Sequence, residues 1–362
     1  MLVQSAPVSR AGSVPTHNLV AQYRFKGEIR IVCVNLHLGF DVQFVLNPLL
    51  FTKSKELGEE YSMSWQFQLL NKPWGGVTEG PVWDGEALYY THIPTSRIMR
   101  FDPKTEEITQ ARGDTNRTNG LCYDAGGRLF GCCSGGRAIV RFDSDGTTAT
   151  IADRLDGKKI STPNDLAVDR QGRVWFTNPW NAGNIDATEI EELDHRSVLR
   201  ADPQPDGSYS VSRVTFDTTM PNGVLVSIDQ RTLYVAESNS DRNDIDRELR
   251  AYPIKDDGSL GPYRVLHAFS KDSTGVHRGI DGMCLDIDGN IIATAGWNRA
   301  GPGPLIYVFS PNGRVIETHR VPCDMPTNCC FGGPGMTTLF MTSLNGQLFR
   351  AETDRVGWAM YP

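Results

Sequence analysis

The chain has 362 residues, of which 39% are hydrophobic and 22% are charged, and its formal net charge is −7 at pH 7. This composition is typical of a soluble globular protein. The acidic balance argues against a nucleic-acid-binding surface, which needs clustered Lys and Arg. No stretch approaches the roughly 20 apolar residues of a membrane span. The 36 Gly and 21 Pro indicate a fold with many short strands and turns.

The eight cysteines do not predict a disulfide framework. Two pairs are adjacent in the sequence, Cys132–Cys133 and Cys329–Cys330. Neighbouring strand residues point to opposite faces, so neither pair forms a natural bridge. There is no C-x-x-C spacing for a structural zinc site, and the first residues lack the pattern of a secretory signal. We therefore expect a reducing, cytoplasmic location.

Residues 1–60 differ in pattern from the rest of the chain and are interpreted as an N-terminal extension of uncertain structure, ahead of a domain at 61–362. Met1–Asn18 is rich in small and polar residues, which favours a flexible segment. Glu28–Leu36 and Val42–Phe51 read as strands, but neither fits the repeat that follows.

From Glu79 onward, the chain repeats one β-hairpin pattern six times. Each copy opens on a carboxylate or amide residue, runs through an apolar strand, turns and returns. These opening residues, called slot residues below, are Glu79, Asn119, Asn164, Asn222, Asp281 and Asn328. They recur at intervals of roughly 40 to 60 residues, close to the length of a four-stranded propeller blade. The returning runs are Ala87–Ile93, Arg128–Cys132, Arg173–Thr177, Thr232–Ala236, Asn290–Thr294 and Thr338–Thr342.

Six such repeats predict an all-β fold, a six-bladed β-propeller around a central channel. Radial repetition leaves only short, protected sheet edges. A run near Trp65–Leu70 is expected to supply the outer strand that closes the last blade against the first. Ala187–Leu193 is the one stretch of this region that hints at helix. A β-sandwich also uses many short strands, but it does not explain six copies of one hairpin.

All six slot residues are predicted to face one end of the channel, called the mouth below. In a propeller the innermost strand lines the channel, and the antiparallel second strand returns to the same end. The long insertions Asn178–Arg196, Ser238–Arg247 and Trp297–Pro304 open there too, as is usual for binding loops on a rigid scaffold. Candidate residues at the mouth, besides the slot residues, are His92, Arg117, Asn178, Trp180, His277, Arg278 and Trp297.

Repeats one, three, four and five supply two carboxylates and two amides, from Glu79, Asn164, Asn222 and Asp281. Such all-oxygen ligands suit a hard cation, and calcium accepts irregular oxygen ligation better than magnesium does. The alternative is that the slot side chains only cap turns. That alternative accounts for the Asn residues more readily than for Glu79 ahead of Gly-Pro.

At these residues the sequence resembles the senescence-marker-protein/gluconolactonase/luciferin-regenerating-enzyme family, which includes regucalcin. The resemblance covers roughly Trp74 to Ala351, and the stretches that carry it are Glu79–Pro103, Thr162–Pro179, Met220–Ser238, Ile280–Asn290 and Pro326–Ser343. It implies a six-bladed propeller with a divalent metal, usually calcium, in the central channel, with Mg²⁺, Mn²⁺ and Zn²⁺ as alternatives. It also implies that Glu79, Asn164, Asn222 and Asp281 are the metal ligands.

The resemblance further implies hydrolysis of a small-molecule lactone, typically a sugar aldonolactone. Two departures occur at the mouth: His92 stands where the family often has Asp in V-D-I-P, and Asn178 where F-T-D-P has Asp. They bear on the substrate rather than on the metal. Two rival functions remain open: a phosphotriesterase or aryl-lactone hydrolase using the same metal, and a non-catalytic calcium-binding propeller that binds a protein partner.

In the expected mechanism, calcium polarises the lactone carbonyl and a general base activates water. By family analogy Asp281 is the leading base. His92 and His277 are alternatives, because a neutral imidazole titrates near pH 7, although each is equally well explained as a loop residue. The predicted substrate contacts are Asn119, Arg117, Asn178, Trp180, Arg278, Trp297 and Asn328. The sequence has neither a G-x-S-x-G elbow nor an H-E-x-x-H helix.

Overall fold

The computed structural model describes residues 3–5, 16–25, 28–37, 64–239 and 242–361. The chain divides into two units, Met1–Glu60 and Tyr61–Pro362. The first contains an antiparallel sheet of β1 (Val3–Ser5), β2 (Thr16–Phe25) and β3 (Glu28–His37) in the order β1-β2-β3. The strand predicted at Glu28–Leu36 is confirmed as β3. The run Val42–Phe51 lies outside the described residues, and parts of Met1–Asn18, predicted to be flexible, form strands.

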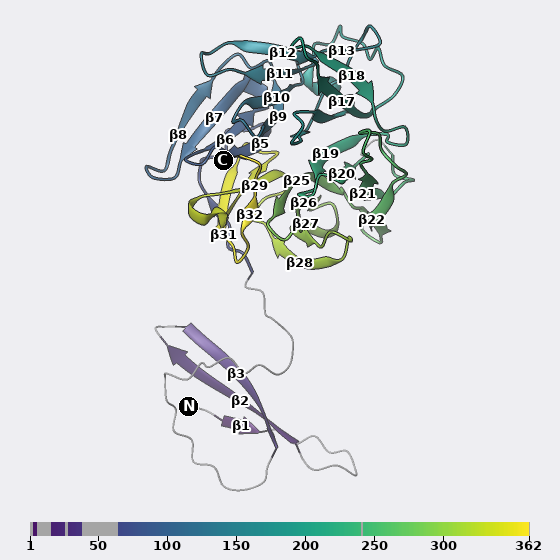
Figure 1. Cartoon of the computed structure of the whole chain (residues 1–362). Helices are drawn as coiled ribbons and strands as arrows, with labels where there is room; N and C mark the ends of the chain where they lie inside the picture. The colour runs from purple at the N-terminus through teal and green to yellow at the C-terminus, as the bar shows by residue number, and fades with distance from the viewer. Residues whose placement is uncertain (1–2, 6–15, 26–27, 38–63, 240–241, 362) are drawn as a thin grey trace. The chain divides into compact units, whose positions relative to one another are not determined.

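The second unit is a six-bladed propeller, which confirms the predicted fold (Figure 1). Its first three blades are β5 (Thr78–Trp83), β6 (Leu88–His92), β7 (Arg97–Asp102) and β8 (Glu107–Arg112); β9 (Thr118–Tyr123), β10 (Leu129–Cys133), β11 (Ala138–Phe142) and β12 (Thr148–Ala152); and β15 (Leu166–Val168), β16 (Val174–Asn178), β17 (Ser197–Pro203) and β18 (Tyr209–Arg213). In every blade the first strand lies innermost and successive strands are antiparallel.

The remaining blades follow the same plan. They are β19 (Pro221–Val226), β20 (Thr232–Glu237), β21 (Arg247–Pro253) and β22 (Arg264–Phe269); β25 (Ile280–Asp286), β26 (Ile291–Trp297), β27 (Ala300–Phe309) and β28 (Val315–Arg320); and β29 (Pro326–Gly332), β30 (Thr338–Ser343), β31 (Leu348–Glu352) and β4 (Gln68–Leu69). The short elements between them are β13 (Arg154–Leu155), β14 (Lys158–Lys159), β23 (Lys271–Asp272), β24 (Gly275–Val276), and the 3₁₀ turns η1 (Ile93–Thr95), η2 (Ala182–Asn184) and η3 (Pro334–Met336).

The ring closes as the sequence predicted, because β4 supplies the outer strand of blade 6 and pairs antiparallel with β31. Trp65, just ahead of β4, stacks on the His319 ring of blade 5 at 3.9 Å. The Thr327 hydroxyl donates a hydrogen bond of 2.7 Å to the Thr78 carbonyl, which joins blade 6 to blade 1. No helix in the described part of the chain is long and apolar enough to cross a membrane.

The core lies between adjacent blades, and β16 shows why. Val174 and Phe176 pack into the cluster shared with blade 2, whereas Trp175 packs into the cluster shared with blade 4. A strand with two buried faces needs an unbroken apolar run rather than alternation. Burial of each apolar side chain of this size stabilises the folded state by roughly 1.5–3 kcal/mol.

The helix hinted at by Ala187–Leu193 is wrong, because these residues form turns and irregular backbone. Two acids in the stretch turn inward to a buried cation: Glu189 accepts a hydrogen bond of 2.6 Å from Arg137, and Glu192 lies 3.8 Å away. Leu193 packs into the cluster between blades 2 and 3. These tertiary contacts override a weak local helix propensity.

Candidate active site

Each slot residue lies where the pairing between the first two strands of its blade is interrupted. The register shifts between Glu79 and Val82 in blade 1, and equivalent shifts span the slots of blades 4, 5 and 6. In blade 2 the shift spans Thr118 to Leu121 and so includes the slot residue Asn119, and in blade 3 the first strand begins only after the slot. Because such bulges re-aim side chains and are common beside active sites, the slot side chains are released from the in-and-out alternation of the strand.

Four slot residues are followed by a glycine, and these glycines let neighbouring blades approach closely. A Cβ on Gly80 would lie 2.6 Å from the carbonyl oxygen of the next slot residue, Asn119. A Cβ on Gly223 would lie 2.5 Å from the Asp281 carbonyl oxygen, and a Cβ on Gly282 would collide with the Asn328 side chain. Because glycine has no side chain, the slot residues of neighbouring blades can lie close together around the channel.

We expect Gly223→Ala to lower the free energy of unfolding by about 1 to 3 kcal/mol, because the added methyl group meets rigid backbone. Urea unfolding followed by tryptophan fluorescence measures the change. Gly126→Ala is the matched control, since a Cβ there lies 3.4 Å from its nearest neighbour. Equal effects of the two substitutions would contradict the close approach.

Three carboxyl groups gather at the channel: Glu79, Asp281 and Asp165, which are 5%, 6% and 7% exposed. Burial, followed by repulsion from Asp281 and Asp165, raises the pKa of Glu79 well above its ordinary value. Burial likewise raises the pKa of Asp165 to about 7. Asp165 was not predicted as a site residue, although it directly follows the slot residue Asn164 in the sequence.

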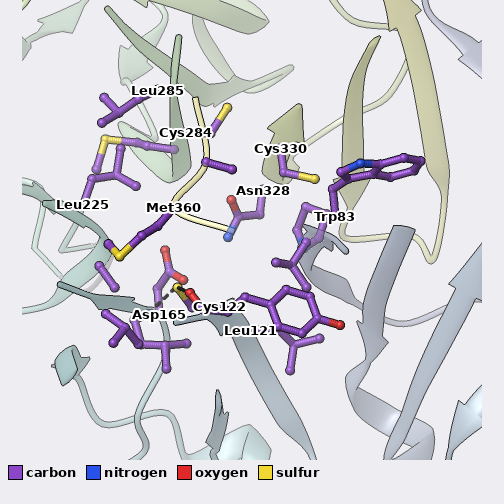
Figure 2. Close-up of a pocket in the computed structure, with 18 of the residues that line it drawn as sticks. Trp83, Leu121, Cys122, Asp165, Leu225, Cys284, Leu285, Asn328, Cys330 and Met360 are labelled. Atoms are coloured by element: carbon purple, nitrogen blue, oxygen red, sulfur yellow. Dashed lines mark hydrogen bonds between the residues drawn. The ribbon is translucent and has the colours of Figure 1, made fainter. Parts of the chain in front are cut away.

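Amide groups connect these acids. The Asn328 side chain lies beside Glu79 and Asp165, where it lowers the pKa of both carboxyl groups and so opposes the effect of burial, and its own Oδ1 accepts a hydrogen bond of 2.8 Å from the Cys329 amide. Figure 2 shows Asn328 and Asp165 at the channel. The Asn222 side chain likewise lies beside Asp281 and lowers the pKa of that carboxyl group. Asn328, predicted as a substrate contact, thus lies next to two carboxyl groups of the channel.

The predicted ligand set fits a hard cation on the chemistry of its donors. Glu79 and Asp281 are close enough that repulsion from Asp281 raises the pKa of Glu79, and a divalent cation would relieve this repulsion. Among the described residues, no group of three or more His, Cys, Asp or Glu could hold a metal. A cation here would therefore depend on the amide oxygens of Asn164 and Asn222 as well as on the two carboxylates.

A cavity of about 480 Å³ opens beside these donors. Five predicted site residues line it: Asn164, Trp180, Asn222, Arg278 and Asp281. The lining also includes residues that were not predicted as site residues, among them Asn181, Arg196 and Ser238. Arg196 ends one of the insertions that were predicted to open at the mouth, and Ser238 begins another. The boundaries of these insertions could therefore have identified both residues as candidates.

Arg278 links the cavity wall to the acids. Its guanidinium forms an ion pair with the Asp281 carboxylate and donates a hydrogen bond of 2.8 Å to the Pro326 carbonyl. Burial raises the pKa of Asp281, and the Arg278 cation opposes this rise. Arg278 is thus the positive charge that neutralises Asp281.

The two candidate histidines lie apart from the lining of this cavity. Both ring nitrogens of His92 are engaged, Nδ1 with the Thr95 hydroxyl at 2.7 Å and Nε2 with the Gly75 carbonyl at 2.8 Å. His277 stacks on Phe269 at 4.6 Å, and its Nδ1 accepts a hydrogen bond from the Gly279 amide. Burial lowers the pKa of His277 to about 4, so this imidazole stays neutral at physiological pH.

Four further predicted contacts are likewise absent from the cavity lining. The Arg117 amide donates to the Ser96 hydroxyl at 3.0 Å, and Arg117 takes a left-handed backbone conformation with φ of 55°. Asn119 and Asn178 are buried, and Asn119 Oδ1 and both amide atoms of Asn178 lack a partner among the described residues. The Trp297 ring faces the Arg299 guanidinium at 5.3 Å.

The chain is similar in sequence and in fold to known proteins. The family model described as the SMP-30/gluconolactonase/LRE-like region matches residues 77–345. A gluconolactonase from Zymomonas mobilis is 30% identical over 295 residues, which cover 76% of this chain and 79% of the relative. A 6-deoxy-6-sulfogluconolactonase from Pseudomonas putida is 26% identical and covers 73% of this chain and 82% of its own length. The solved structure of a gluconolactonase from Xanthomonas campestris superposes with a TM-score of 0.67 at 28% identity, covering 81% of this chain and 90% of that one.

Proposed function

Because the chain belongs to the SMP-30/gluconolactonase/LRE-like family, we propose that it hydrolyses a sugar aldonolactone-like ring with the help of a divalent cation, calcium by preference. The proposed ligands are Glu79, Asn164, Asn222 and Asp281. The observation that carries the proposal is the placement of three of these donors, Asn164, Asn222 and Asp281, in the wall of one cavity of about 480 Å³. That volume suits a small ligand rather than a protein segment.

When bound, the cation supplies Lewis-acid polarisation of a carbonyl oxygen. The protein's own contribution begins with Asp281, which the Arg278 guanidinium holds in place by an ion pair. Fixing the carboxylate before substrate arrives avoids reorganisation during the reaction. The Arg278 guanidinium also lies in the cavity wall, where its remaining donor capacity suits substrate hydroxyl or carboxylate oxygens.

Asp281 is the proposed general base, because a base must lie within hydrogen-bond reach of the attacking water. It lines the cavity, whereas His92 and His277 do not. His92 has both ring nitrogens engaged, and His277 packs against Phe269. Without a cation, burial raises the pKa of Asp281 despite the neighbouring Arg278.

The proposal is tested by a pH-indicator assay of the purified protein over sugar lactones, aryl lactones and phosphotriesters, each with EDTA and with added calcium. We expect turnover of an aldonolactone that EDTA abolishes and calcium restores, measured above the spontaneous hydrolysis in buffer. Turnover that survives exhaustive chelation would contradict a cation-dependent reaction. Calcium binding without turnover of any of these substrates would favour the non-catalytic alternative.

A further inference from the structure

The last residues of the chain leave blade 6 and join a different blade. After β31 ends, β32 (Gly357–Trp358) pairs antiparallel with β25, the innermost strand of blade 5. The Ile287 amide extends this pairing with a hydrogen bond of 2.9 Å to the Val356 carbonyl. Because β25 already lies innermost, a strand added to its free edge must lie over the channel.

The segment joins β25 at the end away from the mouth. Its partners are Leu285 and Asp286, at the end of β25, whereas the slot residue Asp281 lies near the start of the same strand. Strands rise about 3.3 Å per residue, so the pairing lies more than about 10 Å along the channel from the slot. The C-terminal segment therefore covers the end of the channel opposite the mouth.

This segment also crosses the channel. Its tip, Tyr361, packs against Tyr123 of blade 2 with ring centroids 5.3 Å apart. A Cβ on Gly127, also in blade 2, would lie 2.7 Å from the Tyr361 ring. Blades 2 and 5 stand opposite each other in a ring of six, so a chain that contacts both passes over the whole opening.

Specific contacts hold the crossing segment. The Arg355 guanidinium forms ion pairs with Asp286 at 2.8 Å and with Glu317. Asp354 accepts a hydrogen bond of 2.9 Å from the Trp65 indole. Gly357 packs so tightly on Phe331 that any Cβ would collide with it. The ion pairs of Arg355 and the close packing of Gly357 thus fix this segment, whereas the last residues of most domains are poorly ordered.

Above the segment lies a cavity of about 150 Å³, lined by residues of all six innermost strands and by Trp358–Tyr361. Asp165 and Asn328 are among its polar residues, and Met360 comes from the C-terminal segment (Figure 2). Four cysteines also line it: Cys122, Cys284, Cys329 and Cys330. The cavity is thus the channel itself, between the carboxylates and the C-terminal segment.

We infer that residues 354–361 form a plug that closes the far end of the channel, so that the candidate metal centre meets solvent through the mouth alone. A closed channel separates the cavity beside Asp165 from bulk solvent at this end, and electrostatic interactions are stronger where bulk water is excluded. The inference rests on strand pairing and packing, and it holds whatever reaction the mouth supports.

The channel cysteines are built-in reporters of the plug. A variant that ends at Gly357 lacks Trp358–Pro362 but keeps Arg355 and its ion pairs. Native protein and variant are treated with iodoacetamide without denaturant, and labelling at each cysteine is followed by peptide mass spectrometry. We expect Cys122, Cys284 and Cys330 to react at least about tenfold faster in the variant. Cys132 and Cys323 are buried and absent from the channel lining, so their rates should not change.

Arg355→Gln is the second variant, because it loosens the anchor without shortening the chain. Arg350→Gln is its control, since Arg350 pairs with the exposed Glu106 on the outside of the ring. Selective labelling of the channel cysteines in Arg355→Gln, but not in Arg350→Gln, supports the plug. Channel cysteines that react at the native rate in both plug variants overturn it. If truncation also exposes Cys132 and Cys323, the domain has unfolded and Arg355→Gln decides the question. No lactone or cation is used, so failure of the proposed hydrolysis leaves this test unaffected.

Discussion

Asp281→Asn and Glu79→Gln are each expected to lower lactone hydrolysis by at least about 100-fold while leaving a folded propeller. Each change keeps the size of the side chain and removes one negative charge from the donor set. With a single carboxylate left among the four proposed ligands, the site no longer offsets the charge of a divalent cation. Asp281→Asn also removes the proposed base.

Three measurements belong together: initial rates at saturating calcium, calcium affinity by titration calorimetry, and circular dichroism to confirm the fold. Glu106→Gln and Asp145→Asn are matched controls, because both acids are exposed and far along the chain from any slot. We expect both losses, of rate and of affinity, in the site variants and neither in the controls. Wild-type turnover by Asp281→Asn or Glu79→Gln would refute the metal-centred mechanism.

The architecture was predictable because a propeller repeats one solution six times. The apolar hairpins predict strands, and the repeat length predicts blades. A strand that is ambiguous in one repeat can therefore be assigned from the same pattern in the other repeats. Even the closing strand β4 could be predicted, since a ring must end where it begins. The N-terminal unit offered no such redundancy.

The site was predicted less completely, for reasons that lie in single contacts. Asp165 was missed because the repeat assigns one polar residue to each slot, whereas blade 3 places two in succession. Asn328 is a slot residue like the others, yet only the structure shows that it lies beside Glu79 and Asp165 and lowers the pKa of both. The residue type of His277 suits a general base, but its stacking on Phe269 depends on how the short connection through β23 and β24 folds back.

The plug illustrates another limit. β32 is two residues long, too short to carry a periodic signal. Its position follows from the Arg355 ion pairs and from the fit of Gly357 on Phe331. Neither contact is visible without the fold, because the partners come from blades 5 and 6.

Stability without metal should depend on pH through Asp165. Its pKa is about 7 in the folded protein against an ordinary value of 3.8, so between these values the folded state binds more protons than the unfolded state. Stability from this group is therefore present at low pH and is lost as pH rises from about 4 to 7. At about 1.4 kcal/mol for each pKa unit, the loss amounts to as much as roughly 4 kcal/mol. Glu79, whose pKa is also raised, acts in the same direction.

Asp165→Asn removes this dependence while keeping the shape of the side chain. Urea unfolding of EDTA-treated wild type and variant is measured from pH 5 to pH 8, and the free energies of unfolding of the two proteins are compared at each pH. Buried neutral histidines such as His277, with its pKa lowered to about 4, contribute with the opposite sign, but they are common to both proteins and cancel. We expect the free energy of unfolding of the variant to rise relative to that of the wild type as pH increases, by a few kcal/mol at pH 8. Added calcium should reduce this difference, because it stabilises the carboxylates of the wild type. Parallel stability curves for the two proteins would show that Asp165 titrates alike in the folded and unfolded states, and the three-acid channel described above would then be wrong.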